Sequence, residues 1–104
     1  MKAKIEYLPF VKNDLEEAFI WYKKINPKLA NRFIQDYKTQ IKHISEFPLS
    51  CEQKFKSIRI SFLNPFPFGI HYKYKKTENI VVVYAVFHTS KNPELFETVT
   101  KLTS

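Results

Sequence analysis

The strongest pattern in the chain is an uninterrupted apolar run near its C-terminal end. Residues 80–87 (IVVVYAVF) are all apolar or aromatic, and most are β-branched or aromatic. The run is too short to cross a membrane, and its valine content favours a strand over a helix. Because apolar side chains occupy both the odd- and the even-numbered positions, we expect a strand that is buried on both faces and lies inside a sheet. Asn92 and Pro93 stop this strand soon after its end.

The first half of the chain predicts one strand and two helices. Alternation of polar and apolar residues over residues 2–8 indicates a short strand with one solvent-exposed face. Apolar residues then recur every three or four positions over 9–25 and again over 27–46, which is typical of amphipathic helices. Asn26 has the character of an N-cap, followed by Pro27 at the first helical position. Because the break between the helices is so short, we expect an antiparallel helical hairpin.

The second half returns to the alternation of strands. Residues 54–63 and 68–75 each alternate, and residues 64–67 (NPFP) between them form a turn short enough for a hairpin. A second turn at residues 76–79 leads into the buried strand. The result is a three-stranded antiparallel meander that ends in the most buried strand.

This order predicts one α+β domain spanning residues 1–104. It consists of an N-terminal strand, an α-helical hairpin and the three-stranded antiparallel meander, with all strands in one sheet and the hairpin over one face. The opposite face is expected to carry Arg59, His71, Lys73 and also Lys75. The tail at residues 94–104 has apolar spacing compatible with a short helix.

The composition excludes several kinds of site. With a single glycine, Gly69, the chain has no Gly-rich phosphate loop. With a single cysteine, Cys51, it has neither an internal disulfide nor a Cys-based zinc site. The three histidines lack metal-ligand spacing, so we expect no metal and no cofactor. No apolar leader or membrane-spanning run is present, which predicts a cytoplasmic protein without membrane contact.

The positive charge is concentrated in the second half of the chain. The net charge is +7, and residues 53–104 hold eight basic and three acidic residues. Residues 53–77 contain six Lys or Arg and no acid. Such a one-signed block suggests an anionic partner, either nucleic acid or an acidic protein segment. A lysine-rich solvated surface without a partner explains the same pattern.

Some of these residues suit metal-independent cleavage of RNA. That reaction needs a group that exchanges a proton with the 2′-hydroxyl, cations for the developing charge, and an acid for the leaving oxygen. His88 and Lys91 follow the buried strand, and Arg59 stands between two serines where packing does not require it, so these three are candidate catalytic residues. Candidates for binding a nucleic acid or another target are basic or aromatic residues of the neighbouring strands: Lys54, Lys56, His71, Tyr72, Lys73 and Lys75.

Structural explanations compete with these roles. The ring of His88 can hydrogen-bond a backbone group and fix the turn that follows. His71 is explained equally well as an exposed side chain without a role, and Arg59 as the partner of a local acid. Trp21 belongs either to the core or to an interface.

Four stretches, in this order of elements, resemble the RelE/ParE family of bacterial type II toxin–antitoxin toxins. Residues 8–15 (LPFVKNDL) resemble the entry to the family's first helix, and residues 21–30, with their NPKLA segment, resemble its helix-to-helix turn. Arg59 followed by residues 66–72 (FPFGIHY) resembles its strand pair. Residues 86–93 (VFHTSKNP) resemble its closing His, basic residue and Pro signature. The likeness covers nearly the whole chain.

The resemblance implies a small basic toxin that is neutralised by a cognate acidic antitoxin in a hetero-oligomer. It implies one of two targets: RelE-like members cleave messenger RNA in the ribosomal A site, and ParE-like members poison DNA gyrase. RelE-like nucleases carry an Arg where Gly69 stands here, and Lys91 replaces the usual Arg of the closing signature. The His-x-x-basic-x-Pro ending is more similar to the ParE-like branch. The alternative is a catalytically inactive basic module that binds nucleic acid or an acidic protein.

Overall fold

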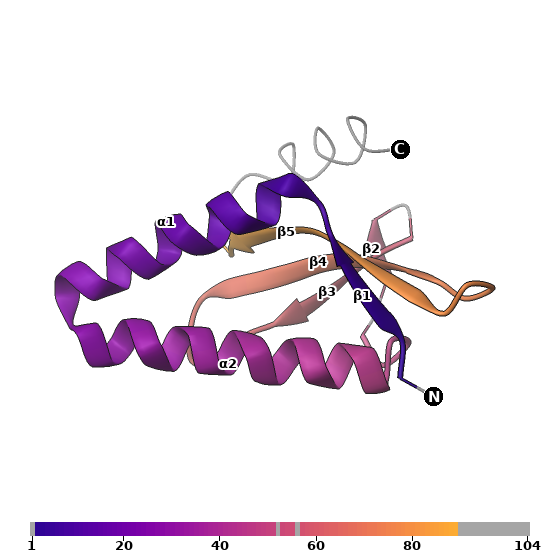
Figure 1. The fold of residues 1–104 in the computed structure, drawn as a ribbon, viewed down its shortest axis with the longest axis horizontal. Helices are drawn as coiled ribbons and strands as arrows, with labels where there is room; N and C mark the ends of the chain where they lie inside the picture. The colour runs from indigo at the N-terminus through magenta and orange to yellow at the C-terminus, as the bar shows by residue number, and fades with distance from the viewer. Residues whose placement is uncertain (1, 52, 56, 90–104) are drawn as a thin grey trace.

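The computed structural model describes residues 2–51, 53–55 and 57–89, with the side chains of residues 54 and 55 left out of the description. Its elements are β1 (Lys4–Tyr7), α1 (Pro9–Ile25), α2 (Pro27–Glu46), β2 (Gln53–Phe55), β3 (Ile58–Phe62), β4 (Phe68–Lys75) and β5 (Ile80–His88). The described strands form one five-stranded sheet in the order β1-β5-β4-β3-β2, and the two helices lie along one face of it (Figure 1). This arrangement confirms the predicted α+β fold. No helix in the described ranges is both long and apolar enough to cross a membrane.

The helical hairpin begins and ends where the sequence predicts. The side chain of Asn26 accepts a hydrogen bond from the backbone N–H of Lys28 at 2.9 Å, which caps α2 one residue after α1 ends. Across the hairpin, Tyr22 of α1 and Phe33 of α2 pack with ring centroids 5.4 Å apart. Phe33 is completely buried against the aromatic ring of Phe68 from β4. These contacts hold the two helices together on the sheet.

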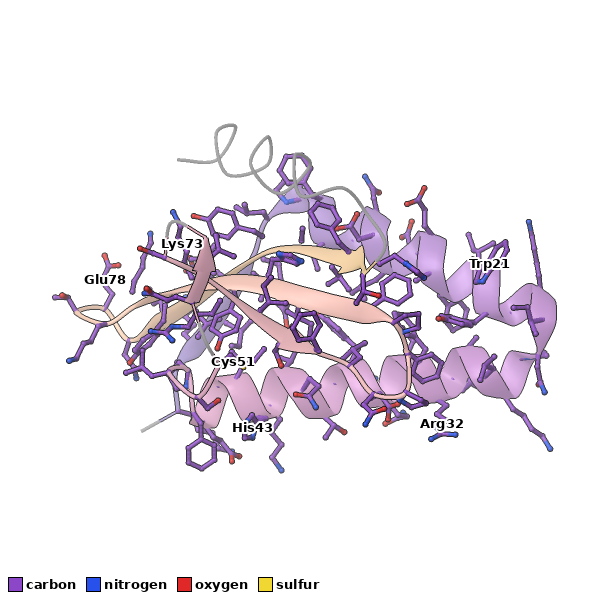
Figure 2. The ribbon with its side chains drawn as sticks, turned by 180° about the vertical axis from the view of Figure 1, so that it is seen from behind. Trp21, Arg32, His43, Cys51, Lys73 and Glu78 are labelled. Atoms are coloured by element: carbon purple, nitrogen blue, oxygen red, sulfur yellow. The ribbon has the colours of Figure 1, made fainter. Side chains whose placement is uncertain are left out.

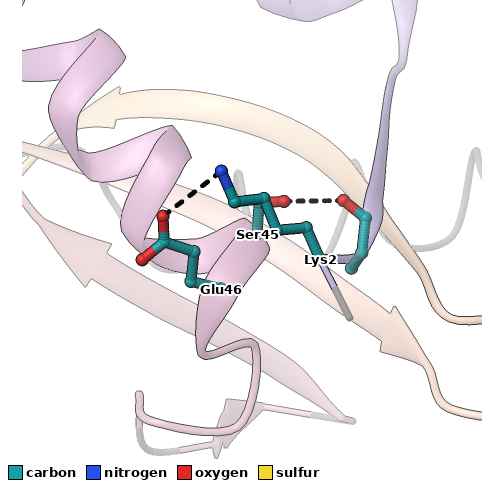
Figure 3. Close-up of polar contacts among 4 residues, drawn as sticks. Lys2, Ser45 and Glu46 are labelled. Carbon is teal, nitrogen blue, oxygen red and sulfur yellow. Dashed lines mark hydrogen bonds and ion pairs between the residues drawn. The ribbon is translucent and has the colours of Figure 1, made fainter.

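The first strand joins the sheet at its edge. β1 runs parallel to β5, whereas the other neighbouring pairs are antiparallel. The hydroxyl of Ser45 near the end of α2 donates to the carbonyl of Ala3 at 2.7 Å, and Lys2 pairs with Glu46 at 3.6 Å (Figure 3). The start of β1 is therefore tied to the end of the hairpin as well as to the sheet.

β5 is buried on both faces, as its apolar run predicts. Val81 and Val83 belong to the main core beneath the helices. Val82 and Tyr84 form a second cluster with Ile58 on the opposite face of the sheet. Because each face needs its own apolar residues, the run shows no alternation.

The predicted strand over residues 54–63 is two strands in the structure. β2 and β3 pair antiparallel, with Phe55 opposite Ile58, so the chain reverses direction between them. Ser57 adopts a left-handed backbone with φ of 70° at this reversal. A non-glycine residue with positive φ gives little sequence signal, which is why the turn was not predicted. The predicted helix over residues 94–104 lies outside the described residues.

The structure also corrects the predicted position of Arg59. Cross-strand pairs place Arg59 opposite Tyr72, and Ile60 opposite His71. Since paired residues point to the same face, Arg59 shares the helix-covered face with Tyr72, and His71 lies on the other face. The apolar side chains of Ile58 and Ile60 belong to the second cluster, so alternation leaves Arg59 on the helix side.

Candidate functional site

Arg59 and Tyr72 hold down the loop that follows α2. A guanidinium nitrogen of half-buried Arg59 donates to the carbonyl of Cys51. The hydroxyl of Tyr72, whose side chain is fully buried, donates to the carbonyl of Pro48 at 2.9 Å. Burial is the main cause that raises the pKa of Tyr72, so its hydroxyl remains a protonated donor near neutral pH. Both side chains are engaged in hydrogen bonds within the fold.

His71 is enclosed on the sheet face away from the helices. It is only 4% exposed, and its ring meets the ring of Phe87 nearly edge-on, with centroids 5.2 Å apart. Burial lowers the pKa of His71 to about 4, because the charged imidazolium is poorly solvated there. The imidazole is therefore neutral at physiological pH, and His71 adds no positive charge to this face.

Lys73 and Lys75 supply the positive charge on β4. The ammonium of half-buried Lys73 lies 5.4 Å from the ring centroid of Tyr84, within cation–π range. Lys75 is exposed at the end of the strand. We call the surface around half-buried Lys73 and exposed Lys75, which lies over the buried cluster of Ile58 and Tyr84, the open face of the sheet; Lys73 marks it in Figure 2.

His88 lies at the other end of the sheet, against α1. It pairs with Phe68, and the two rings meet edge-on with centroids 5.2 Å apart. The half-buried side chain lines a groove of about 380 Å³ between α1 and the end of β5. We call this the Trp21 groove; it is lined chiefly by Asp14, Glu17, Trp21, Tyr22, Phe68 and His88.

Among the described candidates for RNA cleavage, Arg59, His71 and His88 do not lie together, whereas Lys91 lies outside the described residues. Arg59 and His88 pair with Tyr72 and Phe68, which are four residues apart on β4 and so separated by about 14 Å along the strand. Completely buried Ile70 lies between them under the helices. His71 is on the opposite face. No single phosphodiester can contact all of these side chains in this conformation.

The remaining predicted residues cannot be placed by their side chains. Lys54 belongs to β2, but its side chain is outside the description, as are residues Lys56 and Lys91. Their proposed roles stay predictions. Among the described residues, no group of three or more His, Cys, Asp or Glu side chains is arranged to hold a metal ion.

The sequence did not predict the role of Asp14. A carboxylate oxygen of Asp14 accepts a hydrogen bond from the backbone N–H of Val86 at 3.0 Å. In the sequence Asp14 is one of several acids early in a helix, where the helix dipole explains it.

Trp21, which the sequence left between core and interface, is 63% exposed and therefore outside the core.

Comparison with known proteins decides the family. The family model described as the ParE toxin of the type II toxin–antitoxin system, parDE, matches residues 5–93. The chain belongs to the ParE toxin family. It is 30% identical over 88 residues to toxin ParE2 of Mycobacterium tuberculosis, covering 84% of this chain and 82% of that protein.

Solved structures share the ParE-family fold at low sequence identity. The chromosomal ParDE system of P. aeruginosa matches with a TM-score of 0.74 at 16% identity, covering 86% of this chain and 98% of that one. A double mutant of E. coli toxin RelE in the free state matches over the full length of both chains, with a TM-score of 0.62 at 13% identity. These likenesses confirm the fold expected for the RelE/ParE superfamily.

Proposed function

We propose that this ParE-family toxin arrests growth by binding DNA gyrase and does not cleave RNA. The separation of Arg59, His71 and His88 carries the proposal. Positioned acid–base catalysis requires groups within hydrogen-bond reach of the reacting atoms. Here one candidate anchors a loop, one is buried and neutral, and one lines a groove at the far end of the sheet.

The environment of Gly69 supports the same conclusion. A Cβ atom at this position would lie 2.8 Å from Cγ2 of Ile60, which is closer than real contacts of this kind. RelE-like nucleases resemble this chain but carry an Arg at the matching position. The side chain of Ile60 would have to shift to admit any side chain at this position, arginine included.

The open face is the surface that we assign to target binding. Lys73 and Lys75 lie on it, and the exposed side chain of Phe62 projects from neighbouring β3. Positive charge with adjacent apolar area suits contact with a large protein–DNA target without any chemical step. We further propose that a cognate acidic antitoxin neutralises the toxin, in keeping with a family of two-component systems.

Induced expression in a bacterial host tests the proposed function. We expect DNA breakage and filamentous cells while the messages stay uncut and protein synthesis falls only later. The charge swap Lys73→Glu/Lys75→Glu should abolish the arrest. Lys38→Glu/Lys42→Glu is the matched control, because it changes the net charge equally on the exposed side of α2.

Three outcomes would contradict this function. Cut messages with an early halt in synthesis would indicate a nuclease. Normal growth while folded protein accumulates would indicate a basic binding module that is not a toxin. Equal loss of arrest in both charge-swap variants would remove the open face as the binding surface. Coexpression of the neighbouring reading frame should restore growth if it encodes the antitoxin.

A further inference from the structure

The outer flank of α1 exposes apolar side chains near its C-terminal end. Trp21 is 63% exposed, Ile20 54% and Ile25 62%. Figure 2 shows Trp21 on α1 near the turn between the helices. Exposed apolar patches that include an aromatic residue are typical of protein–protein contact sites. This flank belongs to α1, whereas Lys73 and Lys75 of the open face belong to β4.

The flank borders the Trp21 groove, whose inner wall is aromatic and aliphatic. Tyr22, Phe68 and Val86 form this wall at the end of β5. Glu17 lies four residues before Trp21 on the same helix, so the carboxylate and the indole are neighbours on one side of α1. The groove therefore combines an exposed indole, a nearby carboxylate and an apolar wall.

The course of β1 explains why the groove is open. β1 pairs with β5 only as far as Tyr7 opposite Val83, and the chain then turns away into α1. The described residues place no strand beside β5 beyond this point. Asp14 accepts a hydrogen bond from the backbone N–H of Val86, so this donor of β5 is already used within the fold.

The charge of the groove is opposite to that of the whole protein. The chain carries a net charge of +7, whereas the groove lining offers the exposed carboxylate of Glu17 and, among the described residues, neither Lys nor Arg. A cation on an aliphatic stem fits such a site. Arginine fits best, because its planar guanidinium stacks on an indole while its N–H groups pair with a carboxylate.

We propose that the Trp21 groove binds an arginine from a segment of a partner protein. The guanidinium stacks on Trp21 and pairs with Glu17, and an apolar neighbour in the segment packs against Tyr22 and Phe68. This inference is independent of the toxin's target.

The single tryptophan of the chain provides the test, because indole fluorescence reports on this groove alone. The probes are blocked tripeptides, Leu-Arg-Leu and its neutral isostere Leu-citrulline-Leu, titrated into the full-length protein. We expect saturable quenching by the arginine peptide and binding about three- to fivefold weaker for citrulline, the factor expected of one exposed cation–π or ion-pair contact.

Two variants with equal charge change provide the control. Glu17→Gln should weaken binding of the arginine peptide about threefold, as expected for an exposed ion pair. Glu16→Gln should leave it unchanged, because that exposed carboxylate points to another side of α1. Equal binding of the two peptides, equal effects of the two variants, or no saturable binding of the arginine peptide would each overturn the proposal.

Discussion

The carboxylate of Asp14 accepts a hydrogen bond from the backbone N–H of Val86, across 72 positions of the sequence. The bond joins the first helix to the strand on which the fold is built. It also satisfies a donor at the point where β1 no longer pairs with β5. The early turns of α1 are thereby tied to the sheet beside the Trp21 groove, whose lining includes both residues.

Asp14→Ala should lower the free energy of unfolding by about 1–3 kcal/mol, because the buried N–H of Val86 loses its acceptor. Asp14→Asn should cost less, since the amide oxygen can still accept the bond. Urea denaturation measures both effects. Asn13→Ala is the control at the adjacent exposed position. Equal stabilities of Asp14→Ala and the control would contradict the assigned role.

Arg59 and Tyr72 should act together in stabilising the loop after α2. Tyr72→Phe removes the bond to Pro48, and Arg59→Leu removes the bond to Cys51. We expect each to cost about 1–2 kcal/mol of unfolding free energy. Since both anchor one short loop, a double-mutant cycle should show an interaction energy of about 0.5 kcal/mol or more. Strict additivity would mean that the two bonds are independent.

Gly69→Ala should destabilise the protein by about 1–3 kcal/mol through overpacking against Ile60. Alanine is otherwise favoured over glycine inside a strand, so backbone propensity acts in the opposite direction. Ile60→Ala in the same chain should recover most of this loss. Denaturant unfolding of the two single variants and the double variant measures the coupling, and a neutral Gly69→Ala would show that the strands separate easily.

His71 should make stability depend on pH below neutrality. Its pKa is lowered from 6.5 to about 4 by burial, so the folded protein binds the proton less readily than the unfolded chain. The free energy of unfolding is therefore not reduced by His71 above pH 6.5. It decreases as the pH falls towards 4, by at most on the order of 3 kcal/mol. His71→Gln should flatten this part of the pH profile. If the variant shows the same slope of unfolding free energy against pH between 6.5 and 4, the pH dependence comes from groups other than His71.

Periodicity was sufficient to predict most of the fold. The helices end at the predicted residues because Asn26 and the prolines mark their boundaries. The burial of β5 on both faces follows from its continuous apolar run. The turn at Ser57 was missed because its positive φ is set by the pairing of β2 with β3, which local propensity does not encode.

The candidate site was harder to predict, since it depends on which strand faces meet. Alternation correctly placed Arg59 on the opposite face of β3 from Ile58 and Ile60. It could not show that these isoleucines pack on the face away from the helices. The partner of Asp14 depends on a contact 72 residues away. Tertiary contacts of this kind leave no periodic trace in the sequence.

Incubation of the purified protein with gyrase and supercoiled DNA tests the central claim most directly. A parallel reaction contains ribosomes programmed with a messenger RNA. We expect trapped, gyrase-dependent DNA breaks that Lys73→Glu/Lys75→Glu abolishes, and intact message in the ribosome reaction. Cleavage of the message with no effect on gyrase would contradict it.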